Sequence, residues 1–285
     1  MKRIFLVGTP RSGTTLLQSL IGCSPDIITF KESHLFSHSF SLRLPFIPVH
    51  KNPYAEVRRF YRENEIALSC LPSPLRPTDL LNRNAIAAYF ISALDSAGEE
   101  KGKSAWLEKT PRHLLYTDLI EKAAARNHKE VFFIHLIRDG ISVAASISKA
   151  SKTWQKSLDT FSALQRWQKE IAITRKESQK DNHLIVSYES LLAQPEQTIF
   201  RLAKQLRIQL NLEDLQRRNE VLSTIIRQDE TWKLDTASKQ IGHLRRTKSH
   251  IGSAEKKHLE AHIDYTDYNF LLDQIHSAQL RETHG

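Results

Sequence analysis

Cysteine is scarce in this chain: Cys23 and Cys70 are its only two cysteines among 285 residues. They form neither a CxxC pair nor the spaced set of a disulfide framework. A small secreted fold held together by disulfides is therefore excluded, and free structural thiols in a reducing compartment are expected.

Long hydrophobic runs are missing as well. The first apolar stretch, Ile4–Val7, has only four residues and ends in a glycine-rich turn. A signal peptide needs an apolar region of about 7–15 residues, and a membrane-spanning helix needs about 20. We therefore interpret the stretch as a buried strand, which predicts a soluble, cytoplasmic protein without a membrane span.

The chain also lacks the acidic residues that would balance its basic ones, and its formal net charge is +9. The basic residues are scattered apart from two short clusters, Arg58-Arg59 and Arg245-Arg246-Thr247-Lys248. Because there is no long basic tail and no aromatic platform interleaved with basic residues, nucleic-acid binding is a minor interpretation. A small polyanionic cofactor is attracted by the same charge.

Short apolar runs alternate with helical patterns, without internal repeats or a linker that divides the chain. The strand-like runs are Ile4–Val7, Ile27–Phe30, Ala105–Leu107, Val131–Ile137 and Leu184–Val186. Apolar residues at i, i+3 and i+4 spacing predict helices at Thr14–Ile21, Leu80–Ala97, Leu114–Ala125, Ile141–Ser148, Leu158–Ser178 and Glu196–Gln205. We therefore expect one α/β domain over residues 1–285, with a central parallel sheet of about five strands and helices on both faces. Ligands of such sheets bind beyond the carboxyl ends of the strands.

The segment Phe36–Pro77 interrupts this alternation, because it contains six of the ten prolines. It predicts a cap or insertion, partly loop and partly a helix at Tyr54–Leu68, within residues 36–100. Since it follows the second strand, the cap can shape an acceptor pocket; a plain surface excursion is an equally good interpretation.

The first strand leads into Gly8-Thr9-Pro10-Arg11-Ser12-Gly13-Thr14-Thr15 and then into a helix. Two glycines five positions apart allow backbone N–H groups to turn toward an anion at the helix N-terminus. The spacing matches the P-loop pattern GxxxxGK followed by Ser or Thr, except that Thr14 replaces the lysine. Without that lysine, hydrolysis of ATP or GTP is poorly supported, whereas Arg11 supplies a permanently charged planar group. A P-loop-like three-layer fold is expected.

This loop, together with Leu16-Leu17, resembles the 5′-phosphosulfate loop of sulfotransferases that use 3′-phosphoadenosine 5′-phosphosulfate (PAPS). The resemblance is greatest to the branch with tyrosylprotein sulfotransferases and bacterial enzymes of PRSGTT type. It implies that the cofactor contacts Arg11, Ser12, Gly13, Thr14 and Thr15. Arg138-Asp139 and Ser146, after the strand Val131–Ile137, resemble the family's 3′-phosphate site at the same spacing, which implies that Arg138 and Ser146 hold that phosphate.

The same resemblance implies the catalytic groups. The family has a glutamate after the second strand, which matches Glu32 as the base for the acceptor hydroxyl; His34 and His38 are alternative bases. Its Lys-x-Pro element matches Lys109-Thr110-Pro111, so Lys109 and Arg11 are expected to stabilise charge on the sulfuryl group. No metal is expected, since the sequence has no HExxH, EF-hand or spaced Cys/His motif.

Later correspondences are looser. Tyr188, in Val186-Ser187-Tyr188-Glu189-Ser190-Leu191, matches the family's tyrosine near the nucleotide. Ser238, His243 and Arg245 fall in a segment that resembles the loop closing over PAPS, although His243 stands where the family usually has Lys or Arg.

The sequence thus predicts a PAPS-dependent sulfotransferase acting on a hydroxyl of a carbohydrate, a lipid, a small alcohol or a tyrosine. The acceptor among these and the oligomeric state stay open. A P-loop nucleotide kinase is the second enzyme hypothesis, which Thr14 and the Arg138–Ser146 pair oppose. A non-catalytic adenylate sensor or nucleic-acid-binding protein is the third, and it would leave Glu32 and Lys109 without a role.

Overall fold

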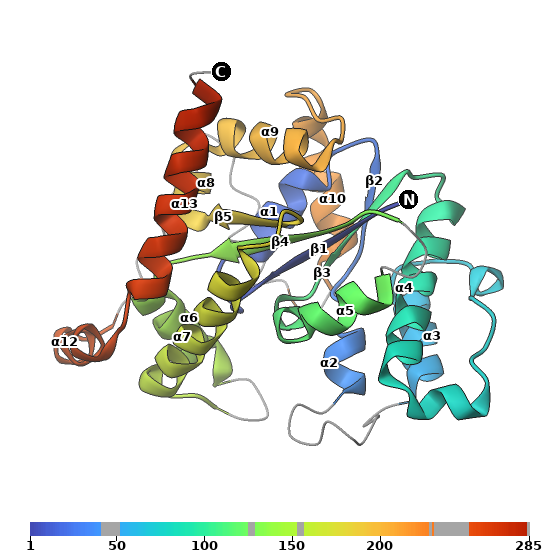
Figure 1. Ribbon diagram of the computed structural model, residues 1–285, viewed down its shortest axis with the longest axis horizontal. Helices are drawn as coiled ribbons and strands as arrows, with labels where there is room; N and C mark the ends of the chain where they lie inside the picture. The colour runs from blue at the N-terminus through green and yellow to red at the C-terminus, as the bar shows by residue number, and fades with distance from the viewer. Residues whose placement is uncertain (41–51, 125–128, 153–156, 228–229, 231–250, 284–285) are drawn as a thin grey trace.

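A five-stranded parallel sheet, with the order β2-β3-β1-β4-β5, forms the centre of the described part of the chain (Figure 1). The computed structural model describes residues 1–40, 52–124, 129–152, 157–227, 230 and 251–283. The strands are β1 (Lys2–Gly8), β2 (Ile27–Thr29), β3 (Ala105–Lys109), β4 (Val131–Ile137) and β5 (His183–Ser187). The predicted α/β class and parallel sheet are confirmed, and every strand lies within two residues of its predicted bounds.

Most residues of the strands are apolar because both faces of the sheet are covered. In β1, Ile4 and Leu6 pack into a core on one face, while Phe5 and Val7 pack into a core on the other. All four side chains are buried. β1 lies in the centre of the sheet, between β3 and β4, and its buried Arg3 is paired with Asp95.

Helices cover each face of the sheet, as predicted (Figure 1). The Ile4 face is covered by α1 (Thr14–Ile21), α8 (Tyr188–Ala193), α9 (Pro195–Leu206), η5 (Asp214–Arg217) and α10 (Arg218–Ile225). The Phe5 face is covered by α2 (Leu35–Ser39), α3 (Pro53–Glu63), α4 (Arg83–Glu100), η3 (Pro111–Tyr116) and α5 (Thr117–Ala124). A third apolar cluster beside Ile137 joins α6 (Gly140–Ser151), α7 (Thr160–Glu177), α12 (Ser253–His262) and α13 (Thr266–Thr283).

Most predicted helices differ from the observed ones at their ends, and three of them show the local reason. The helix predicted at Tyr54–Leu68 ends at Glu63, because Glu65 has a φ of 55° and cannot continue it. The one predicted from Leu80 begins at Arg83, where the Asn82 side chain accepts hydrogen bonds from two backbone N–H groups. The segment from Pro111 is a 3-10 turn before it becomes α5. Helices α2, α8, α10, α12 and α13 were not predicted.

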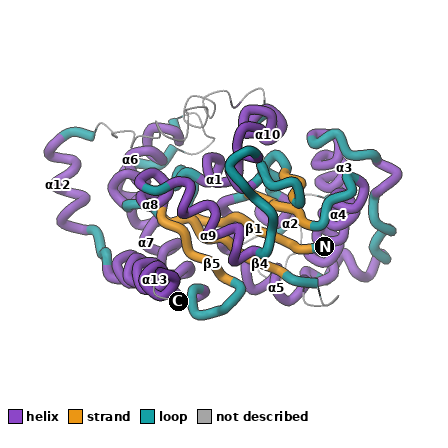
Figure 2. Tube along the Cα trace, turned by 90° about the horizontal axis from the view of Figure 1, so that it is seen from above, coloured by secondary structure: helices purple, strands orange, loops and turns teal. Residues whose placement is uncertain are grey.

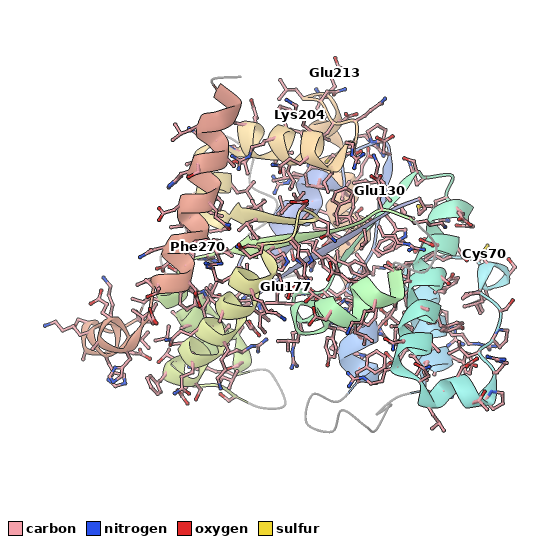
Figure 3. All side chains as sticks on the ribbon, viewed as in Figure 1. Cys70, Glu130, Glu177, Lys204, Glu213 and Phe270 are labelled. Atoms are coloured by element: carbon pink, nitrogen blue, oxygen red, sulfur yellow. The ribbon has the colours of Figure 1, made fainter. Side chains whose placement is uncertain are left out.

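The described residues of the predicted cap, 36–40 and 52–100, form a helical layer beside β3, with α2, α3, α4 and the short turns η1 (Leu68–Cys70) and η2 (Pro77–Leu81). Aromatic rings fill it: Phe36 packs edge-on against Phe90 with ring centroids 5.5 Å apart, and Phe30 against Phe60 at 5.2 Å. Both views place α3 and α4 at the opposite end of the molecule from α12 and α13 (Figures 1 and 2). Cys70 lies at the outer rim of this layer (Figure 3), Cys23 is buried, and both are free thiols, as predicted.

Candidate active site

The loop between β1 and α1 has a backbone that only glycine allows at two positions. Gly8 has a φ of 148°, and a Cβ there would lie 2.5 Å from the Leu136 carbonyl oxygen. Gly13 has a φ of 99°, and a Cβ there would lie 2.5 Å from the Tyr188 ring. The two glycines therefore let the loop turn tightly against β4 and Tyr188.

The same loop presents groups that can bind an anion. Helix α1 begins at Thr14, and the first N–H groups of a helix have no partner within it. Ser12 is buried, and its hydroxyl has no hydrogen-bond partner within the described residues. Arg11 has a left-handed φ of 74°, which is a strained conformation for a residue with a side chain. Strained residues of this kind cluster at functional sites.

The structure brings Arg138 and Ser146 to this loop. Arg138 Nη1 donates to the Arg11 carbonyl oxygen at 3.1 Å, and its guanidinium lies 4.3 Å from the centroid of the Tyr188 ring. Arg11 Nε donates to Ser146 Oγ at 3.1 Å. Ser146 thus pairs with Arg11 instead of Arg138, and the predicted cofactor residues from both motifs form one continuous cluster. Their contacts with a cofactor stay a prediction.

This cluster is strongly cationic. Burial lowers the pKa of Arg11, the neighbouring Arg138 lowers it further, and Glu32 acts in the opposite direction. Two neighbouring guanidinium groups repel each other, so an anion bound between them would be stabilised. Arg138 Nε is buried and, in the part of the chain that is described, has no hydrogen-bond acceptor. Arg138 Nε and Ser12 Oγ are thus two unused buried donors of this cluster, which fits a ligand with more than one anionic group.

The predicted base and lysine lie together beside the loop. Lys109 is the last residue of β3, and its Nζ lies 2.5 Å from Glu32 Oε1 and 3.3 Å from Thr15 Oγ1. The side chain of Lys109 is 1% exposed and that of Glu32 is 13% exposed. The structure therefore joins the carboxylate after β2, the lysine of β3 and the phosphate loop after β1 in one place.

Two histidines flank Glu32. His34 Nε2 lies 3.5 Å from Glu32 Oε2. Burial lowers the pKa of His34 to about 4, although Glu32 opposes this shift, so His34 is neutral near pH 7. The ring of His38 stacks on His34 at 5.0 Å, and its Nδ1 donates to Glu56 at 2.9 Å.

Two arginines that the sequence did not assign to the site hold the backbone around Glu32. Arg227 donates to the Glu32 carbonyl oxygen at 2.6 Å and to Glu63 at 2.7 Å. Arg59 donates to the Ser33 carbonyl oxygen at 2.7 Å and pairs with Glu63 at 2.8 Å. The only signal in the sequence was the short Arg58-Arg59 cluster. The Ser33 carbonyl oxygen and Arg227 belong to other parts of the chain.

The acidic residues of the Arg138-Asp139 and Tyr188-Glu189 pairs support the site without facing it. Asp139 caps α6 by accepting from Ser142 N at 2.8 Å, and it also accepts from the Tyr265 hydroxyl at 2.8 Å. Glu189 accepts from Asp139 N at 3.1 Å and from the Tyr268 hydroxyl at 3.1 Å. The C-terminal segment thus fixes the turn that carries Arg138. Ser238, His243 and Arg245 lie outside the described residues.

One group of side chains in the described ranges has the composition of a metal site: Glu121, Glu177 (Figure 3) and His183. Lys180 Nζ donates to each of the two carboxylates at 2.5 Å, so an ammonium already offsets part of their negative charge. His183 also begins β5, whereas the anion-binding cluster lies beyond the carboxyl ends of the strands. This group is therefore separate from the candidate active site.

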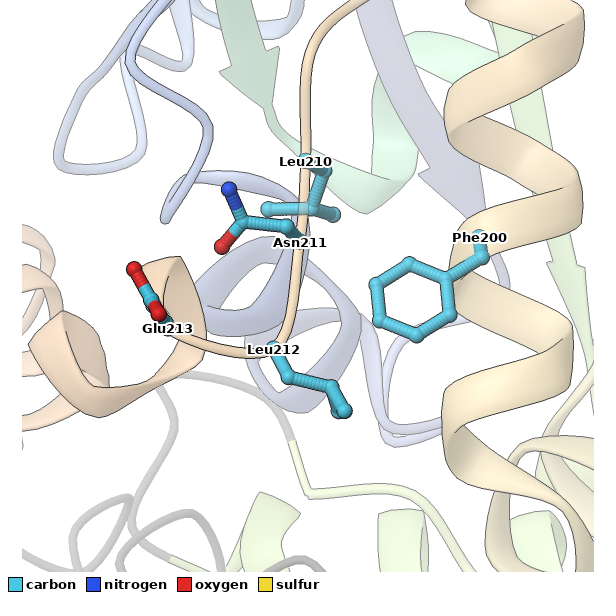
Figure 4. A pocket seen from close by; sticks show the side chains of 5 residues that line it. All are labelled: Phe200, Leu210, Asn211, Leu212 and Glu213. Atoms are coloured by element: carbon cyan, nitrogen blue, oxygen red, sulfur yellow. The ribbon is translucent and has the colours of Figure 1, made fainter.

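A hollow of about 580 Å³ lies between α9 and η5, lined by side chains labelled in Figure 4: Phe200, Leu210, Asn211, Leu212 and Glu213. The Arg207 carbonyl, three residues before Leu210, accepts a hydrogen bond from Lys2 at the start of β1. The phosphate loop follows the other end of that strand. We therefore assign the hollow no part in the chemistry of the site.

None of the helices in the described ranges is both long and apolar enough to cross a membrane.

Comparisons with known proteins find similar sequences and structures among sulfotransferases. The sequence model described as the sulfotransferase family matches residues 3–213. A protein-tyrosine sulfotransferase of Drosophila melanogaster is 24% identical over 216 residues, which cover 74% of this chain and 39% of that protein. The chain thus spans about two fifths of the length of this curated relative.

Two solved structures have a similar fold. The sulfotransferase domain from the Synechococcus PCC 7002 olefin synthase has a TM-score of 0.55 and 17% identity, with 91% of this chain and 93% of that chain covered. The sulfotransferase domain from the curacin biosynthetic pathway has a TM-score of 0.53 and 17% identity, with coverage of 95% and 96%.

Proposed function

The chain belongs to the sulfotransferase family, and on this premise we propose that it transfers a sulfuryl group from PAPS to a hydroxyl acceptor. The observation that carries the proposal is the cationic cluster of Arg11 and Arg138, with unused buried donors on Ser12 and Arg138, directly beside the Glu32–Lys109 pair. A site with these groups binds a polyanion next to a base, which is what sulfuryl transfer requires.

In this proposal the two motifs hold the two ends of the cofactor. The loop Arg11–Thr15 and the N-terminus of α1 bind the 5′-phosphosulfate, and Arg138 and Ser146 bind the 3′-phosphate. Tyr188, packed between Gly13 and the Arg138 guanidinium, lies beside the nucleotide. Contacts from Ser238 and Arg245 stay predictions from the sequence.

PAPS supplies an activated sulfuryl group whose bond to the 5′-phosphate oxygen breaks as the acceptor oxygen bonds to sulfur. Glu32 takes the proton of the acceptor hydroxyl, and 3′-phosphoadenosine 5′-phosphate (PAP) leaves. Arg11 and Lys109 stabilise the negative charge that develops on the sulfuryl and bridging oxygens. Because these side chains supply the positive charge, the proposed reaction needs no metal ion.

The single-domain organisation and the role of residues 36–100 are also proposals. Helices α2 and α3 approach the Glu32 loop, since His38 stacks on His34 and Arg59 donates to the Ser33 carbonyl oxygen. This supports the proposal that the layer encloses the acceptor. Carbohydrate, lipid, small alcohol and tyrosine hydroxyls all suit one carboxylate base. The Drosophila relative's name favours including a tyrosine peptide among the acceptors tested. We keep a cytoplasmic location and the absence of a nucleic-acid partner as predictions.

The proposal is tested by incubating the protein with ³⁵S-labelled PAPS and either a metabolite extract or tyrosine peptides, followed by identification of labelled products. We expect labelled sulfate on a hydroxyl and release of PAP. Tight PAP binding without transfer to any acceptor class would favour the adenylate-sensor hypothesis. Phosphoryl transfer from ATP without sulfuryl transfer would favour the kinase hypothesis, which Thr14 in place of the P-loop lysine opposes.

A further inference from the structure

A second carboxylate, Glu108, lies beneath the Glu32–Lys109 pair. It is fully buried at 0% exposure, next to Lys109 in β3. Its Oε1 accepts hydrogen bonds from the hydroxyls of Ser33 at 2.7 Å and Thr110 at 2.6 Å. His113 Nδ1 donates to its Oε2 at 2.9 Å. Each of the two oxygens therefore has a close donor.

The donors come from the two segments that carry the proposed catalytic groups. Ser33 follows Glu32, and both its hydroxyl and its backbone N–H donate to Glu108 Oε1. Thr110 follows Lys109, and its hydroxyl also accepts from His34 N at 3.3 Å. The carboxylate thus connects the end of β3 to the loop after β2 at positions adjacent to the pair.

The charge state of Glu108 fits this arrangement. Burial by itself raises the pKa of Glu108, but His113, Thr110 and Ser33 outweigh burial, and the pKa is lowered. A buried carboxylate is a costly way to stabilise a core, because apolar side chains of similar volume often stabilise as well or better. The role we infer for Glu108 is therefore to fix the orientation of the groups that donate hydrogen bonds to it.

We propose that Glu108 is a positioning residue. Its hydrogen bonds link the two segments that carry Glu32 and Lys109 and so hold these two side chains in contact. The inference rests on the proposed function and adds a residue that none of the sequence motifs singled out. Glu108 contacts neither the acceptor nor the sulfuryl group in this scheme; it acts through Ser33 and Thr110.

The test compares E108Q with the parent protein and with D95N. The glutamine keeps the shape and can still accept from Ser33, but it loses the charge and presents an amide to His113. Asp95 is a matched control, since it is 6% exposed and accepts from Arg3 and Trp106. Its partner Arg3 lies near the amino end of β1, whereas the phosphate loop follows the carboxyl end.

A misplacement of about 1 Å can lower a rate about a hundredfold, so we expect E108Q to lower kcat by about tenfold to a hundredfold. PAP affinity, measured by calorimetry, should stay within about twofold of the parent value, because the anion-binding cluster does not depend on Glu108. D95N should lower the melting temperature but keep the parent kcat at a temperature where it is folded.

S33A removes one donor and leaves the buried charge in place, so it serves if E108Q fails to fold. S33A should also lower kcat, and the double variant should be no slower than E108Q, because both changes act through one connection. Parent-like kcat in both single variants would overturn the inference.

Crystal structures of the parent protein and E108Q decide the matter independently of turnover. The inference requires the Glu32–Lys109 contact of 2.5 Å to open in E108Q, and an unchanged contact would refute it. A parent protein that transfers no sulfuryl group would count against the proposed function. The crystallographic comparison would still test whether Glu108 positions Glu32 and Lys109.

Discussion

Replacing Arg138 by alanine is the most direct test of the anion-binding cluster. The side chain donates to the Arg11 carbonyl oxygen, stacks on Tyr188 and has an unused buried Nε. If this guanidinium holds the 3′-phosphate, its removal should weaken the binding of PAP far more than that of AMP, which lacks that phosphate.

The magnitude follows from the contacts that are lost. A hydrogen bond between charged groups contributes about 1.5–3 kcal/mol, and each 1.4 kcal/mol is about tenfold in affinity. With its charge and Nε directed at one phosphate, Arg138 should contribute about a hundredfold to the affinity for PAP. The contacts of the Arg138 guanidinium with the Arg11 carbonyl oxygen and the Tyr188 ring affect both ligands, so AMP binding should fall by less than about tenfold.

The assay is isothermal titration calorimetry of PAP and AMP with the parent protein, R138A and R138K. Lysine keeps the charge but loses the planar guanidinium and its Nε, so R138K should recover only part of the preference for PAP. The melting temperature of each variant, measured without ligand, separates a folding defect from a binding defect.

Equal affinity of the parent protein for PAP and AMP would refute a 3′-phosphate site and, with it, PAPS as the proposed donor. A loss in R138A that is the same for both ligands would have a different meaning. Arg138 would then support the loop at Arg11 without binding the 3′-phosphate.

Three further outcomes are expected. E32Q should lower kcat by about a hundredfold to ten-thousandfold with PAP affinity unchanged; parent-like turnover in E32Q together with loss of activity in H34A would make a histidine the base. Sulfuryl transfer should continue in EDTA, and Mg·ATP should raise the melting temperature less than PAP does; activity lost in EDTA and restored by a metal would contradict charge stabilisation by Arg11 and Lys109 alone. Burial lowers the pKa of His34 to about 4 and those of His135 and His183 below 6.5, so unfolding takes up protons in this range. The free energy of unfolding, measured with urea, should be highest above about pH 6.5 and fall as the pH decreases toward 4, whereas a constant value would show that these histidines are protonated in the folded protein.

The sequence by itself determined the local framework of the site. Val131–Ile137 and Thr14–Ile21 have their predicted bounds, because continuous burial and helical periodicity are local patterns. The strand, the two glycines and the helix start specify the phosphate loop within about fifteen residues, since the required backbone angles belong to Gly8 and Gly13 themselves. Glu32 and Lys109 could be chosen because each comes at or just after the end of a strand, and parallel strands end at one edge of the sheet.

Only the tertiary structure decided which side chains meet at that edge. Arg227 and Glu32 are 195 positions apart, and Tyr265 reaches Asp139 across 126 positions, so no local pattern links them. The pairing of Ser146 with Arg11 depends on how α6 packs beside the loop, and the two hydrogen bonds from Ser33 to Glu108 depend on β2 and β3 being neighbours in the sheet. Periodicity specifies which face of an element is buried, but the partner of each polar group follows from the packing of elements that are distant in the sequence.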